Sequence, residues 1–132
     1  MYRLFVHRDA QGDLERLYVA DHVAAARVVA LLESIAADQD LLDRLTQHDF
    51  GAYRSAEFHV SKWYSHWNKG KDLWRLKAWD LEEQRLQYRV VYAYVPGSRR
   101  YHVLGVLHRN QVKYDDPSDP YTKRILRAFD AL

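Results

Sequence analysis

Cysteine is absent from this chain of 132 residues. Without thiols the protein has no disulfide, no cysteine nucleophile and no thiolate ligand for a metal ion. Glycine and proline are scarce, with five and three residues, which excludes collagen-like and low-complexity sequences. The longest apolar run, Val90 to Val95, has six residues, far fewer than the roughly 20 that span a bilayer. The N-terminal residues lack the apolar segment of a secretory signal, so we expect a cytoplasmic protein.

The composition is that of a folded domain with an uneven distribution of charge. Apolar residues make up 48% of the chain and aromatic residues 14%, which is enough for a core, and the length predicts a single domain over residues 1–132. Residues 1–60 carry 6 basic and 10 acidic side chains, whereas residues 61–132 carry 14 and 8. This division favours a polyanion or an acidic partner for the C-terminal half.

The N-terminal half predicts one strand followed by helices. Alternation over Tyr2–His7 predicts a strand that stops at Asp9–Gly12. Asp21 is a suitable N-cap for a helix, since an apolar stripe follows it at helical spacing, made of Ala24, Val28, Leu31 and Ile35. A second helix is expected over Gln39–Leu45. Residues 48–72 form a possible extra segment, in which the spacing of Trp63 and Trp67 predicts a short helix.

The C-terminal half predicts a three-stranded meander and a final helix. The strands are expected over Leu73–Trp79, Leu86–Val95 and Tyr101–Leu107, with polar turns between them. Asp119 and Pro120 predict the N-cap and first residue of the last helix. The predicted fold class is α+β, with an N-terminal strand and helices packed on one face of an antiparallel sheet.

Basic side chains occur on the predicted strands where apolar residues would add more stability. Arg75 and Lys77 share one face of the first meander strand, Arg89 interrupts the second, and Arg109 follows the third. Together they predict a phosphate-binding face, because arginine binds phosphate through two parallel hydrogen bonds. Tyr114 lies five residues further on and would act as a general acid or base if these cations lowered its pKa. The alternative is a solvated sheet face with scattered cations.

The remaining polar and aromatic residues narrow the chemistry. Four tryptophans near the basic residues are candidates for stacking on unpaired bases: Trp63, Trp67, Trp74 and Trp79. The histidines show no spacing typical of metal ligands, so we expect neither a metal nor another cofactor. His108 is the histidine best placed for a phosphate contact or proton transfer. The serines belong to no nucleophile motif, and no glycine-rich phosphate loop occurs.

The C-terminal half resembles the RelE/ParE superfamily of bacterial toxins. The resemblance rests on Leu73–Lys77, on Tyr88–Tyr94, on Val103–Arg109 and on Tyr114, in that order. It implies a compact domain with helices packed on a sheet. For RelE-like members it also implies an endoribonuclease that cuts mRNA on translating ribosomes without a metal, through attack of the RNA 2′-hydroxyl on the adjacent phosphate. The implied partners are mRNA, the ribosome and a cognate antitoxin protein, with no membrane.

The resemblance also implies roles for individual residues. Arg75 and Lys77 match positions that hold the phosphate and assist proton removal, and Arg89 matches an arginine that stabilises developing charge. Arg109 matches an arginine near the leaving group, and Tyr114 matches a tyrosine that orients or stacks on the substrate base. Lys113 and His108 join Arg75 as expected RNA contacts. Some relatives carry lysine at the position of Arg75. The pKa of an arginine is too high for it to accept a proton, so the candidates for the general base are Lys77, His108 and Tyr114.

Two other functions remain open on the sequence. One is a ParE-like toxin that binds DNA gyrase and has no nuclease activity, in which case the basic residues would be dispensable. The other is a non-catalytic binding protein with a RelE-like fold.

Overall fold

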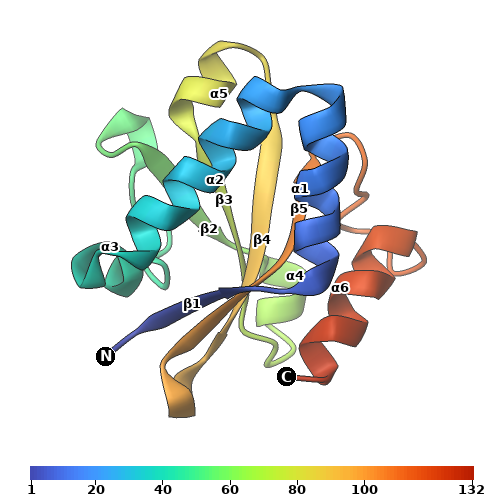
Figure 1. Cartoon of the computed structure of the whole chain (residues 1–132). Coiled ribbons are helices and arrows are strands. Elements are labelled where there is room, and N and C mark those ends of the chain that lie inside the picture. Colours follow the sequence, from blue (N-terminus) through green and yellow to red (C-terminus); the bar gives the residue numbers. More distant parts are fainter.

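The computed structural model describes all 132 residues and is built around a five-stranded sheet (Figure 1). The strand order is β1-β5-β4-β3-β2, and the strands are β1 (Arg3–Val6), β2 (Phe58–Lys62), β3 (Leu73–Ala78), β4 (Tyr88–Val95) and β5 (Arg100–His108). The three strands β3, β4 and β5 form the predicted antiparallel meander. The sheet as a whole is mixed, because β1 pairs with β5 in parallel.

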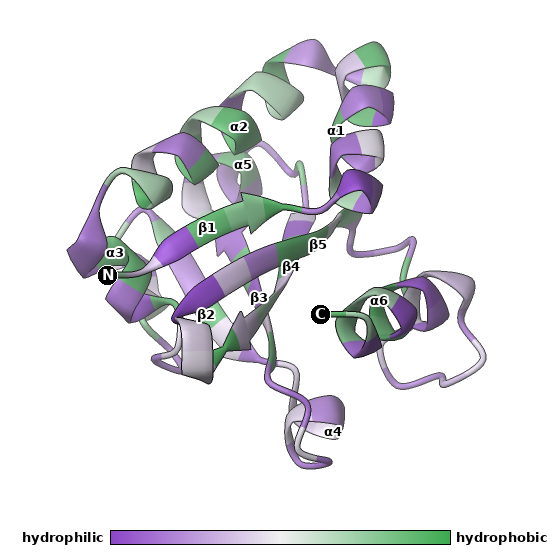
Figure 2. Cartoon of the chain, turned by 60° about the horizontal axis from the view of Figure 1, so that its bottom comes forward, coloured by the Kyte–Doolittle hydropathy of each residue, from purple (hydrophilic) through white to green (hydrophobic).

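Helices cover both faces of this sheet. Helices α1 (Arg8–Ala20), α2 (His22–Ala36) and α3 (Gln39–Arg44) precede β2 in the chain. Helix α6 (Pro120–Asp130) and the short α4 (Tyr64–Trp67) lie on the other side of the sheet from α1 and α2 (Figure 2). The expectation that the helices pack on one face is therefore wrong.

The pattern of β4 explains why both faces are covered. Val90 and Tyr92 face a core that includes the buried residues of α1, α2 and α3. Val91 and Ala93 point the opposite way, into a second core with Ile125 of α6. Apolar residues on both faces of a strand require a packing layer on each.

Helix α1 follows β1 almost directly. The strand ends before Asp9, as predicted, and residues 9–12 form the first turns of the helix, where the imidazole of His7 accepts a hydrogen bond from the Asp9 backbone N–H. This side-chain cap satisfies one of the free N–H groups at the start of the helix. The predicted cap of α2 is confirmed, because Asp21 accepts a hydrogen bond from the Ala24 N–H.

Residues 48–72 supply an edge strand that the sequence analysis missed. The predicted short helix is confirmed only over α4, and β2 precedes it and pairs antiparallel with β3. Phe58 and Val60 are buried in the first core, while His59 and Ser61 are partly exposed. A one-turn 3-10 helix, η1 (Ala52–Arg54), leads into this strand.

Two further short helices lie at turns of the meander. The expected polar turn after β3 is largely helix α5 (Trp79–Glu83), and the turn between β4 and β5 contains the 3-10 helix η2 (Pro96–Ser98). Helix α6 starts as predicted, with Asp119 accepting a hydrogen bond from the Thr122 N–H and Pro120 in the first turn. No helix combines the length and apolar character needed to cross a membrane.

One buried carboxylate connects three elements. Asp13 of α1 is 3% exposed and accepts hydrogen bonds from both terminal nitrogens of Arg124 on α6, at 2.9 and 2.6 Å. It also accepts the backbone N–H of Val106 on β5 at 3.0 Å. This ion pair runs past Gly105, where an added Cβ would lie 3.3 Å from Arg124.

Candidate functional site

The basic side chains predicted from the sequence gather at one end of β3 and β4. Across the pairing of β2 with β3, Ser61 lies opposite Arg75 and His59 opposite Lys77. Arg89 lies one residue beyond the last β3–β4 pair, which places it beside Lys77. The side chains line a cavity of about 240 Å³, made of His59, Ser61, Arg75, Leu76, Lys77 and Arg89. We call this cavity the basic cavity.

Tyr114 packs against Arg75. The guanidinium carbon of Arg75 lies 4.5 Å from the centre of the Tyr114 ring, and that ring meets Trp63 edge-on with centroids 5.0 Å apart. The Nε of Arg75 and the hydroxyl of Tyr114 are both buried without a hydrogen-bond partner. Buried polar groups normally have partners, so an acceptor that entered here would satisfy a donor that the chain leaves unpaired.

Arg89 is held by an acidic residue that the sequence analysis did not select. Its guanidinium forms an ion pair with Glu82 of α5, and the two side chains are only 14% and 13% exposed. Arg89 also donates to the carbonyl of Tyr88 at 3.2 Å. These bonds hold the guanidinium in one orientation at the edge of the basic cavity. Glu82 was missed because it lies in a segment expected to be a turn.

The environment of Lys77 disfavours its charged form. Partial burial is the largest cause of a lowered pKa, and the nearby Arg89, Arg109 and Arg75 lower it further, while Glu82 opposes the shift. A lysine surrounded by three arginines and partly removed from water releases its proton more readily than an exposed lysine does. Lys77 therefore has the chemistry of a proton acceptor, which no arginine in the cavity shares.

Tyr114 behaves differently from the expectation that cations would lower its pKa. Burial raises the pKa of its hydroxyl, and the charges of Arg75 and Arg89 offset this only in part. The hydroxyl therefore stays protonated at neutral pH. Tyr114 can donate a hydrogen bond or present its ring, but it is unsuited to accept a proton.

The other predicted site residues lie further from the basic cavity. Arg109 is exposed just after β5, where its backbone N–H donates to Gln87, and its charge still acts on Lys77. His108 is on the opposite face of the sheet, with its ring edge-on to Tyr88 at 5.3 Å. Lys113 is exposed in the loop before α6. The structure thus brings together Arg75, Lys77, Arg89 and Tyr114, with Arg109 nearby and His108 apart.

His59 is the histidine that faces the basic cavity. Its Nε2 lies 3.0 Å from a carboxylate oxygen of Asp49, and that hydrogen bond is the main cause of a lowered pKa for Asp49. A carboxylate bonded to one ring nitrogen fixes the orientation of an imidazole. In the sequence, apolar and polar residues alternate over Phe58 to Ser61, which is typical of a strand and would have placed His59 on its polar face. The helical spacing of the tryptophans that follow favoured a helix instead.

Two of the four tryptophans expected to stack on bases are unsuited to that role. Trp63 and Trp74 are 2% and 3% exposed and belong to the two cores. Trp67 is exposed and carries the Lys62 ammonium 3.8 Å from a ring centroid. Trp79 is half-buried at the start of α5, next to the basic cavity.

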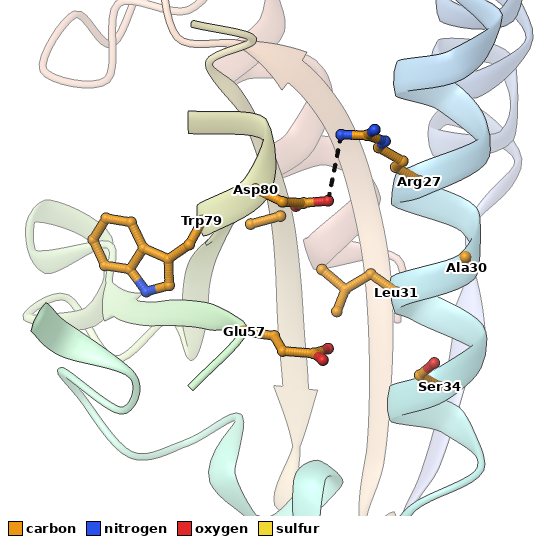
Figure 3. A pocket seen from close by; sticks show the side chains of 8 residues that line it. Arg27, Ala30, Leu31, Ser34, Glu57, Trp79 and Asp80 are labelled. Atoms are coloured by element: carbon orange, nitrogen blue, oxygen red, sulfur yellow. Dashed lines mark ion pairs between the residues drawn. The ribbon is translucent and has the colours of Figure 1, made fainter. Parts of the chain in front are cut away.

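A larger cavity of about 340 Å³ lies between α2 and α5 and has a different character (Figure 3). Its charged side chains are one arginine and two carboxylates: Arg27 lies 3.7 Å from Asp80, and Glu57 lines the same space. Figure 3 shows the Trp79 ring directed away from α2. This cavity lacks a cluster of cations, so the basic cavity is the stronger candidate for a phosphate-binding site.

No group of three histidine, aspartate or glutamate side chains could hold a metal ion in this structure. Comparison with known proteins adds no relative: no model of a protein family matches the chain, and no curated protein or solved structure is significantly similar to it.

Proposed function

We propose that the protein is an endoribonuclease that cuts mRNA at the basic cavity. The observation that carries the proposal is the position of Lys77, a half-buried lysine with a lowered pKa among Arg75, Arg89 and Arg109. Such a cluster can bind a phosphodiester through the arginines and accept a proton through the lysine. The ion pair with Glu82, in which both side chains are largely buried, fixes one of these arginines at the cavity.

The proposed reaction uses the RNA as its own nucleophile. The 2′-oxygen bonds to the adjacent phosphorus as its proton passes to Lys77, and the bond from phosphorus to the 5′-oxygen of the next nucleotide breaks. The products are a 2′,3′-cyclic phosphate and a free 5′-hydroxyl. Arg75 and Arg89 stabilise the charge that develops on the phosphoryl oxygens, which is a main source of catalysis in phosphate chemistry.

The leaving 5′-oxygen requires a proton, and His59 is placed to supply it. His59 lies opposite Lys77 across the β2–β3 pairing, so the two titratable groups flank the same space. Asp49 orients the imidazole through its hydrogen bond. An acid and a base within reach of one phosphate can carry out the two proton transfers of this reaction. Arg109 adds positive charge near Lys77, and the ring of Tyr114 packs against Arg75.

The biological setting follows from the resemblance to the RelE/ParE superfamily. We propose a cytoplasmic toxin that acts on translating ribosomes and is neutralised by a cognate antitoxin. The net positive C-terminal half supports association with RNA, because basic surfaces steer proteins to polyanions.

The reaction is tested with purified ribosomes programmed with a short mRNA. We expect a cut that leaves a 2′,3′-cyclic phosphate, and we expect a single 2′-deoxy substitution at the cleaved nucleotide to abolish that cut alone. Cleavage that persists without the 2′-hydroxyl would contradict the mechanism. The absence of any cut, together with inhibition of DNA gyrase, would favour the ParE-like alternative.

A further inference from the structure

A second cavity adjoins the basic cavity and is unused by the proposed chemistry. It measures about 510 Å³, within the usual range for small-ligand sites, and lies between η1 and the start of α5. His59 and Lys77 line both cavities, so the two spaces are contiguous. A group bound in one is therefore within a nucleotide's reach of the other.

Trp79 provides a fixed flat wall of this second cavity. Its indole N–H donates to the carbonyl of Gly51 at 2.8 Å, and its ring lies parallel to His59, with centroids 5.7 Å apart and planes 5° from each other. The ring points away from α2 (Figure 3). Two cations lie near its face, Lys77 at 4.9 Å and Arg54 at 5.6 Å from the ring centroid.

Tyr53 is a second aromatic residue that lines this cavity. Its side chain is fully exposed, and its backbone has φ +57°, a left-handed conformation that is uncommon for an aromatic residue. Asp49 and Arg54 on the same loop also have positive φ, at 66° and 64°. Strained backbone of this kind concentrates at ligand-binding sites. The left-handed backbone of Tyr53 therefore lowers the stability of the fold, and its fully exposed side chain makes no contact that would compensate for this.

We propose that this second cavity binds an unpaired RNA base next to the cleaved phosphate, with Tyr53 and Trp79 as its aromatic lining. The inference rests on the proposed function, since the bound base belongs to the nucleotide whose phosphate occupies the basic cavity. Aromatic platforms bordered by cations are the usual means of holding single-stranded bases. Asp49 contributes an acceptor for donor groups on the edge of the base, and its carboxylate is 61% exposed. The site assigns a function to residues 48–54, which the proposed cleavage reaction uses only through Asp49.

Two uncleavable probes separate base binding from phosphate binding. One is a pentamer of 2′-O-methyl adenosine, and the other is an abasic pentamer with the same sugar-phosphate backbone. We expect Tyr53→Ala to weaken binding of the adenosine pentamer by about fivefold to a hundredfold, in the range measured for single base–aromatic stacks, and to leave the abasic pentamer unaffected. Tyr18→Ala is the matched control, because Tyr18 is 62% exposed on α1 and lines neither cavity.

The outcomes distinguish this inference from the proposed function. If Tyr53→Ala binds both pentamers as the unaltered protein does, the base site is wrong, whereas mRNA cleavage by the unaltered protein would leave the proposed function standing. If the unaltered protein binds the adenosine pentamer and the abasic pentamer with equal affinity, the base site is again wrong. A protein that neither binds the pentamers nor cuts mRNA would overturn both proposals.

Discussion

At the scale of single residues, Lys77 differs from the arginines around it because only a lysine with a lowered pKa gives up its proton at accessible pH. We expect Lys77→Arg, which keeps the positive charge, to reduce the cleavage rate by about a hundredfold or more, the usual contribution of a general base. If Lys77 only attracted the phosphate through its charge, the arginine variant would cleave mRNA at nearly the same rate as the unaltered protein. Single-turnover cleavage of ribosome-bound mRNA measures the difference.

The pH dependence of the same reaction provides a second readout. The base is active when Lys77 is neutral and the acid when His59 is protonated, so the profile should rise with pH and then fall again. The rise follows from the lowered pKa of Lys77, since a lower pKa makes the neutral form available at lower pH. Lys77→Arg should remove this rise. A pH profile that Lys77→Arg leaves unchanged would assign the base to another group.

At the scale of elements, the Asp13–Arg124 ion pair connects α1 to α6 across the edge of β5. We expect Asp13→Ala to lower the free energy of unfolding by about 3–5 kcal/mol, because it leaves the Arg124 charge and the Val106 N–H without partners. Arg16→Ala is the matched control. Arg16 pairs with the same carboxylate at 2.7 Å but is 69% exposed, so its loss should cost about 0–1 kcal/mol. Urea denaturation of both variants measures the difference, and equal costs would contradict this description of the pair.

Gly51 positions the loop that leads to β2. Its φ is +79°, and a Cβ placed there would lie 1.7 Å from the Phe58 carbonyl oxygen. Gly70 has the same φ, but a Cβ placed there would have no atom within 4 Å. Gly70→Ala should therefore lower the free energy of unfolding only by the left-handed strain, about 1–2 kcal/mol. We expect Gly51→Ala to destabilise the protein more than Gly70→Ala and to weaken the hydrogen bond that holds Trp79. Thermal unfolding compares the two variants, and similar melting temperatures would contradict this expectation.

The elements also show where the sequence was informative. Long periodic segments predicted β3, β4, β5 and α6 well, because their alternation and caps are local signals. β2 was missed because its five residues carry a short alternation next to tryptophans at helical spacing. Arg75, Lys77 and Arg89 were selected because cations are conspicuous on strands. Glu82 and His59 were not, since only the pairing of distant segments places them beside Lys77.

At the scale of the whole molecule, the two faces of the sheet are covered differently. One face is covered by α1, α2 and α3 over the larger core. The other is shared between the smaller core under α6 and the basic cavity at the ends of β3 and β4. The second core stops where Arg75, Lys77 and Arg89 begin, so α6 does not line the basic cavity.

The proposed function is cleavage of translated mRNA at the basic cavity. The most direct test is induced expression in bacteria of the unaltered protein, Lys77→Arg, Arg109→Ala and Arg127→Ala, with primer extension on a translated reporter mRNA. Arg127 is exposed on α6 away from the cavity, so its variant controls for the loss of one positive charge. We expect cuts in phase with codons for the unaltered protein and Arg127→Ala, and none for the other two. Growth arrest with intact mRNA, persisting in all variants, would contradict the proposed function.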